Sequence, residues 1–193
     1  MRIAGIGLVI GIAIVAGCGT PPKEHYYTLA PVEARAVPPG EKVAFTVAVG
    51  PVTVPEVVDR AQIVLRTGAN RVEVSEFNRW AEPLKRSIPR VVAASLSQQL
   101  PSARVVVYSP ADGGADYRVV IDVERFESEP GKTATVAASW SVRRSAGGES
   151  RAGRSIARES VAGAGYEPLV AAHSRALESI AREIAEGLRT MSR

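Results

Sequence analysis

The sequence predicts an α+β domain: a mostly antiparallel sheet with two amphipathic helices packed on one face, in the order strands, helix, strands, helix. Three observations predict this class. Residues 25–31 and 43–77 contain alternating apolar runs rich in Val and Thr, which is typical of strands. The period changes to that of a helix over 83–100, and residues 103–189 repeat the same succession. Each helical segment has one apolar stripe, which must be buried against a sheet.

The first half of the domain begins with strands. Residues 25–31 (HYYTLAP) predict a first strand, and residues 32–42 predict a loop. Residues 43–55 alternate Val and Phe with smaller partners and predict a strong strand, which Gly50-Pro51 is expected to bend or end. Residues 62–77 predict a hairpin.

The first helix is predicted over Pro83–Leu100. Its apolar positions follow helical spacing: Leu84, Ile88, Val91, Val92, Leu96 and Leu100. Pro83 suits the first turn of a helix, whereas Pro89 does not suit an interior, so we expect a kink or a late start there. Pro101 is expected to end the helix.

The second half repeats this order. A short strand is predicted over 103–109, and longer strands over 117–128, 133–144 and 154–163, with a turn at 146–149. A final helix is predicted over residues 167–189, with the apolar stripe Leu169, Leu177, Ile180, Ile184 and Leu188. The two β–α halves suggest an internal duplication, but the sequence contains no repeat that shows it.

The amino terminus has the pattern of a secretory signal. Met1 and Arg2 give a positive start, and residues 3–17 carry no charge. This apolar run is shorter than the roughly 20 residues that a membrane span needs, but it fits the core of a signal peptide. The run ends in Val15-Ala16-Gly17-Cys18, which contains the only cysteine of the chain.

These four residues resemble the lipobox of bacterial lipoproteins. The resemblance implies cleavage before Cys18, a diacylglycerol thioether on its sulfur, and acylation (palmitate) of the new amino terminus. Several acyl chains anchor a protein firmly, whereas one chain binds only marginally. The alternative is an ordinary cleaved signal with an incidental cysteine. Gly19 replaces the aspartate that retains lipoproteins at the inner membrane of enteric bacteria, which favours the outer membrane.

The chain is therefore predicted to have three parts. Residues 1–17 form the lipoprotein signal peptide, residues 18–25 the lipidated cysteine and tether, and residues 26–193 one periplasmic domain. From Cys18 to Tyr26 the chain stretches at most roughly 27 Å, at about 3.3 Å per residue. The domain must then stay close to its membrane, and anything that bridges to the other membrane must come to it.

Several functional classes are not supported. The formal charge is +4, but acidic and basic residues are interspersed. The basic clusters, Arg143-Arg144 and Arg151–Arg158, lack the interleaved aromatics of a nucleic-acid surface, so we interpret them as solvated; anionic lipid or an acidic partner is the alternative. Neither a phosphate-binding glycine loop nor a nucleophile elbow is present. We expect no cofactor, no metal site on His25 and His173, and no catalytic residues.

One stretch is unusual in a chain with few aromatics: Val74–Leu84, VSEFNRWAEPL. In one interpretation Phe77 and Trp80 close the core beneath the helix, and Glu82 caps the helix at its positive end. In the other, Phe77, Asn78, Arg79 and Trp80 form a partner interface, where Trp and Arg are favoured anchors.

Four motifs resemble the PqiC family of ABC-type transport auxiliary lipoproteins. They are Tyr26–Leu29, Val49–Pro55, Asp59–Arg66 and Asn78–Leu84, and the lipobox precedes them at the expected place. The match covers roughly residues 18–110, and the second half agrees in pattern more than in motif. Val57-Val58 departs from the family, where an aromatic or leucine commonly precedes the Asp-Arg pair.

The resemblance implies a role in transport and no enzymatic activity. Such a protein is the outer-membrane partner of an MCE-protein system that passes lipids or other hydrophobic compounds across the periplasm and maintains membrane integrity. It would receive the end of the MCE conduit, with a ring-shaped homo-oligomer as one expected form. The alternative from another class is a stand-alone carrier lipoprotein that binds lipid or a small molecule, which requires an apolar cavity.

Overall fold

The computed structural model describes residues 23–31, 44–110 and 114–192. The elements within these ranges are β1 (His25–Tyr27), β2 (Phe45–Thr53), the 3-10 turn η1 (Glu56–Val58), β3 (Gln62–Gly68), β4 (Arg71–Trp80), α1 (Leu84–Gln99), β5 (Ala103–Val107), β6 (Tyr117–Glu129), β7 (Thr133–Arg144), β8 (Ser150–Ser160) and α2 (Tyr166–Met191). The predicted α+β class and the order of strands and helices are confirmed.

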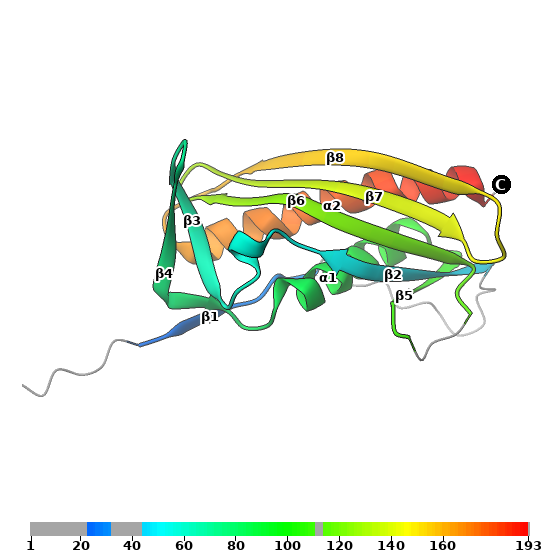
Figure 1. Cartoon of the computed structure of the whole chain (residues 1–193), viewed down its shortest axis with the longest axis horizontal. Helices are drawn as coiled ribbons and strands as arrows, with labels where there is room; N and C mark the ends of the chain where they lie inside the picture. Colours follow the sequence, from blue (N-terminus) through cyan, green and yellow to red (C-terminus); the bar gives the residue numbers. More distant parts are fainter. Residues whose placement is uncertain (1–22, 32–43, 111–113, 193) are drawn as a thin grey trace, which may run out of the picture.

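The strands form two sheets. Five strands in the order β5-β2-β6-β7-β8 make the long sheet, and α1 and α2 lie side by side on one of its faces (Figure 1). Three strands in the order β1-β4-β3 make a small sheet at one end of the molecule (Figure 1). We call the long sheet with its two helices the body, and the small sheet the tether end, because the chain enters the domain there through β1.

Strand direction is mixed. The long ladders β6–β7 and β7–β8 are antiparallel, as is β3–β4. Strand β2 runs parallel to both of its neighbours, β5 and β6, and β1 runs parallel to β4. The β2–β5 pairing needs a long crossover, which consists here of η1, β3, β4 and α1.

Two local expectations involve prolines. Strand β2 continues through Gly50-Pro51, where its register against β6 shifts between Val49 and Val52. Gly50 has φ +125°, a value that a residue with a side chain rarely adopts. Of the two expected outcomes, a bend or an end of the strand, the end is wrong, because β2 continues through this register shift. Helix α1 begins at Leu84 and runs through Pro89, so the late start is wrong.

The core of the body lies between the helices and the long sheet. The apolar stripes predicted for both helices are buried, with Ile88 on α1 and Ile184 on α2 fully enclosed. Full burial of an aliphatic side chain contributes about 1.5–3 kcal/mol, so these stripes hold the layers together. None of the described helices is both long enough and apolar enough to cross a membrane.

Trp140 of β7 occupies a slot between the sheet and α2. Its ring lies over two glycines, Gly153 directly across the β7–β8 ladder and Gly187 on α2. The indole Nε1 donates to Ser155 Oγ at 2.9 Å, and Ser155 Oγ donates to the Glu183 carboxylate at 2.6 Å. The half-buried chain of hydrogen bonds therefore ties β7, β8 and α2 together around one ring.

Candidate functional surface at the tether end

The predicted signal peptide and the lipidation residue Cys18 lie outside the described residues. The described chain begins at Lys23 and immediately enters β1, which pairs with the last three residues of β4: His25 with Asn78, Tyr26 with Arg79 and Tyr27 with Trp80. Two of the motifs found in the sequence are thus neighbouring strands, although 51 residues separate Tyr27 from Asn78.

Side chains alternate between the two faces of this strand pair. On the outer face, the two carboxylate oxygens of Glu24 have separate partners. Tyr26 Oη donates to Oε2 at 2.5 Å, and Arg79 Nη2 lies 2.9 Å from Oε1. The hydrogen bond to Glu24 raises the pKa of Tyr26. The tether is therefore fixed to the domain from Glu24 onward.

On the inner face, Tyr27 Oη donates to Asn78 Oδ1 at 3.1 Å. The ring of Tyr27 lies 5.6 Å from that of Tyr166, at the start of α2. Trp80 is buried and meets Phe126 and His173 edge-on, with ring centroids 5.9 and 6.3 Å away. Alternation thus sends Asn78 and Trp80 inward and Arg79 outward.

The four candidate interface residues therefore occupy different environments. Trp80 belongs to the core, whereas Phe77 remains 38% exposed. Asn78 bonds to Tyr27 of β1, and Arg79 pairs with Glu24 just before β1. Glu82 pairs with Arg90 of α1, and no side chain caps the start of that helix. Sequence reasoning missed Glu24 and Tyr26, because their role depends on a pairing between distant segments.

His173 is fully buried on α2. Its ring stacks on Phe126 with a centroid distance of 4.0 Å and an interplanar angle of 5°, and its Nε2 lies 2.8 Å from Ser128 Oγ. Burial lowers the pKa of His173 to about 3, so the ring is neutral at neutral pH. His25 lies exposed on β1. Within the described ranges, no three His, Cys, Asp or Glu side chains gather in a way that suits a metal ion.

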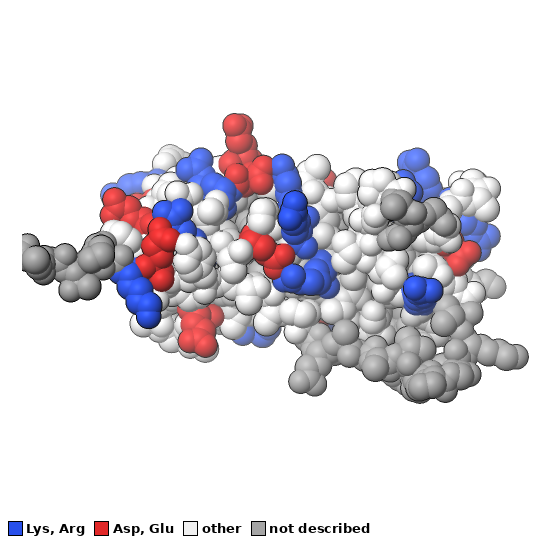
Figure 2. All heavy atoms as spheres, turned by 90° about the horizontal axis from the view of Figure 1, so that it is seen from below, with Lys and Arg blue, Asp and Glu red and all other residues white. Residues whose placement is uncertain are grey.

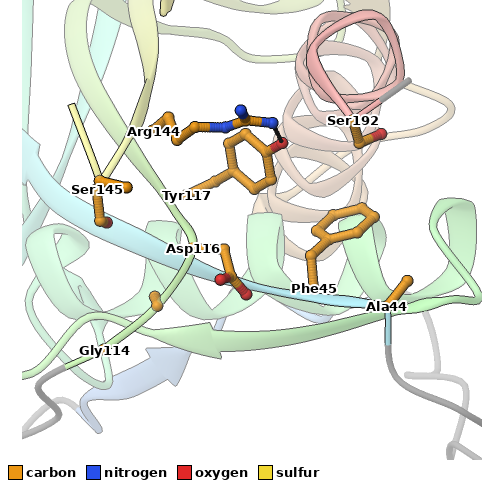
Figure 3. Close-up of a pocket in the computed structure, with 10 residues that line it drawn as sticks. Ala44, Phe45, Gly114, Asp116, Tyr117, Arg144, Ser145 and Ser192 are labelled. Atoms are coloured by element: carbon orange, nitrogen blue, oxygen red, sulfur yellow. Dashed lines mark hydrogen bonds between the residues drawn. The ribbon is translucent and has the colours of Figure 1, made fainter. Parts of the chain in front are cut away.

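The opposite end of the molecule carries a surface hollow of about 600 Å³ (Figure 3). Its charged groups already bond within the chain. Arg144 donates to Tyr117 Oη at 2.8 Å and to the Met191 carbonyl at 3.2 Å, and the Asp116 carboxylate accepts from the Thr46 amide at 2.7 Å. The Arg144 cation also lies at the negative end of α2, where a positive charge is favourable. These contacts join the ends of β6, β7 and α2 at this end of the body.

Charged side chains of both signs lie together on the surface. In Figure 2 they gather mainly over the half that holds the tether end, and acidic and basic groups are interspersed there. Glu124, on the long sheet, pairs with Arg154 at 2.7 Å, and the Arg154 hydrogen bond lowers the pKa of Glu124. Thr53 bonds to the other strand carboxylate, Asp122. Of the basic cluster on β8, Arg154 is thus paired with Glu124, and Arg151 donates to Thr190 Oγ1 at 2.9 Å.

Comparison with known proteins assigns the chain to a family. Residues 27–185 match the model of the ABC-type transport auxiliary lipoprotein component. The chain belongs to this family. The matched range begins at Tyr27 and extends through most of α2, so it includes both sheets and both helices. The resemblance of the four motifs is thereby confirmed, and the family is one of transport components.

Solved structures share the fold. An uncharacterised protein superposes with a TM-score of 0.72 at 19% identity, covering 86% of this chain and 99% of that one. Protein XCC0632 from Xanthomonas campestris gives a TM-score of 0.64 at 17% identity, with the same coverage. No curated protein matches the chain.

Proposed function

We propose that this chain is the outer-membrane lipoprotein subunit of an MCE-type system that moves lipids or other hydrophobic compounds between membranes. Cys18 carries the lipid anchor, and the domain receives the periplasmic end of the MCE conduit. The observation that carries the proposal is the family match over residues 27–185, which describes an auxiliary component of an ABC-type transporter. The lipobox and the short tether support the anchored location.

The fold suits a docking role. The described residues pack around one core, Glu24 is bonded to Arg79 and Tyr26, and the charged groups of the hollow in Figure 3 are bonded within the chain. We further propose that copies of the chain assemble side by side. Among the described residues, β5 is an edge strand of the long sheet, and an edge strand offers its unpaired backbone groups to a neighbouring sheet.

The test is co-purification from membranes with the MCE-domain subunit encoded beside it. The tagged lipoprotein is expected to retain that subunit after mild crosslinking, and the Cys18→Ser variant is expected to leave the membrane fraction and retain much less. Repeated failure of the acylated protein to capture the subunit contradicts the docking role. Native mass spectrometry of the same sample separates the alternative, because a stand-alone carrier releases bound lipid without the MCE subunit.

A further inference from the structure

Exposed apolar side chains gather at the tether end. The described residues include seven large hydrophobic side chains that are well exposed, and four of them lie on the paired strands β1 and β4: Tyr26, Val72, Val74 and Phe77. Their exposed fractions run from 38% for Phe77 to 61% for Tyr26. The packing of the domain itself does not explain this concentration on one small sheet.

The tether brings this same end to the membrane. Glu24 is bonded to Tyr26 and Arg79, and the six steps from Cys18 to Glu24 span at most about 20 Å. The far end of the body is held away. Helix α2 starts beside Tyr27 and extends 26 residues, which corresponds to about 39 Å.

We propose that the tether end rests on the lipid surface, with Val72, Val74 and Phe77 of β4 and the ring of Tyr26 in the headgroup region. Tyrosine favours that region because its ring is apolar and its hydroxyl is polar. Each side chain contributes little alone, but the short tether raises the local concentration of lipid around them. This inference depends on the acylation of Cys18 that the proposed function includes.

The charges of the same strand indicate which lipids suffice. The charges around the apolar residues balance: Lys23, Arg71 and Arg79 stand against Glu24, Glu73 and Glu76, and Arg79 is paired with Glu24 on the face of Tyr26, so this end has no net positive charge. Attraction to anionic headgroups is therefore not the driving force. The contact is expected on vesicles of neutral phosphatidylcholine and is expected to persist at high salt.

The test uses the full acylated lipoprotein in phosphatidylcholine vesicles. In the acylated protein the sulfur of Cys18 carries the lipid, and the sequence has no other cysteine. The substitution Val72→Cys or Val74→Cys therefore introduces a single free thiol. The matched control is Ile156→Cys on β8, since Ile156 is 50% exposed and Val72 is 49% exposed. Each is labelled with an environment-sensitive dye. The emission of the β4 labels is expected to shift to shorter wavelength and to be quenched by lipids spin-labelled near the headgroup. The emission of the Ile156 label is expected to show neither change.

The possible outcomes have distinct meanings. Equal emission and quenching at Val72 and Ile156 overturn the proposal. A shift at Val72 without quenching by spin-labelled lipid also overturns it, because the surface is then covered by a second copy or by a protein partner. The mass of the amino-terminal peptide is determined on the same sample. An unmodified Cys18 refutes the proposed anchor itself, whereas an acylated Cys18 with no quenching refutes only the orientation.

Discussion

The body and the tether end are stabilised in different ways. In the body, large side chains are closely packed, and Trp140 lies between Gly153 and Gly187, where neither residue has a side chain. At the tether end, β1 has only three residues and is held by side-chain bonds to β4, while apolar residues remain exposed. The difference suggests that the two regions have different roles: the body provides the stability of the fold, and the tether end provides attachment. Substitutions in the body should therefore change global unfolding strongly, and those at the tether end should have smaller or local effects.

The largest effect is expected for Gly153→Ala. A Cβ at this position would lie 2.4 Å from Trp140 Cζ2 and within 3 Å of two further ring atoms, so the ring or the strand must move. Overpacking of this kind costs about 3 kcal/mol. Urea unfolding of the protein measures the change as a lower midpoint at constant slope.

Gly187→Ala is the matched control, because it touches the same ring from the other side. Its Cβ would lie 3.2 Å from Trp140 Cη2, a contact that a shift of a few tenths of an ångström relieves. Alanine also gains about 1 kcal/mol of helix propensity over glycine. The net change is expected within about 1 kcal/mol. If both alanines destabilise equally, the slot explanation is wrong, and general crowding around Trp140 replaces it.

The next effect is a pH dependence of the body. The pKa of His173 is about 3 in the folded protein and about 6.5 in the unfolded chain, so only the unfolded state binds the proton between these values. Stability is therefore lost as pH falls below about 6.5, at about 1.4 kcal/mol per pH unit, which amounts to between about 2 and 3 kcal/mol by pH 4.5.

His173→Gln tests this dependence. The variant is less stable at pH 7 because it loses the stack on Phe126, but between pH 6.5 and 4.5 its stability is expected to change less than that of the parent. The measurement is urea unfolding at several pH values. Parallel curves for the two proteins in this window would show that His173 is protonated in the folded state too.

The comparison also explains what could be predicted from the sequence. Local periodicity predicted both helices and most strands, because the spacing of apolar residues within an element shows which of its faces is buried. The register of the β7–β8 hairpin could not be predicted in this way. The predicted turn at 146–149 would pair Ser145 with Ser150 and place Ser155 opposite Trp140, whereas the ladder pairs Arg143 with Ser150 and places Gly153 there.

The tether end could not be predicted in the same way. Pairing of β1 with β4 joins segments about 50 residues apart, and no period or turn indicates which strand receives β1. Without that pairing, Asn78, Arg79 and Trp80 form one aromatic and basic cluster in the sequence, which left open whether they close the core or share an interface. The structure divides them, because neighbouring strand residues point to opposite faces. Phe77 keeps the exposure that a contact surface requires.

A smaller effect is expected for Tyr27→Phe, which removes the hydroxyl that donates to Asn78. The loss of one such hydrogen bond costs about 1 kcal/mol, and the ring contact with Tyr166 is kept. Tyr166→Phe is the control, since its hydroxyl bonds to Ser75 of β4 and not to β1. Urea unfolding measures both. If Tyr27→Phe leaves stability unchanged and Tyr166→Phe lowers it, the bond to Asn78 does not hold β1.

The smallest effect is expected for the ion pair that fixes the tether. Glu24 and Arg79 keep 40% and 29% of their side-chain exposure, and pairs of this kind contribute about 0.2–1 kcal/mol. Glu24→Gln should therefore leave global unfolding almost unchanged and should loosen β1 locally.

The sensitive measurement is hydrogen exchange at the Ala81 amide, which donates to the Tyr27 carbonyl at 2.8 Å and becomes free only when β1 detaches. Exchange there is expected to quicken about threefold, since about 0.6 kcal/mol corresponds to that ratio. The Tyr108 amide, bonded to Val49 in the body, is expected to keep its rate. Equal acceleration at both amides would show that the tether end and the body open together, and the division between attachment and stability would then be wrong.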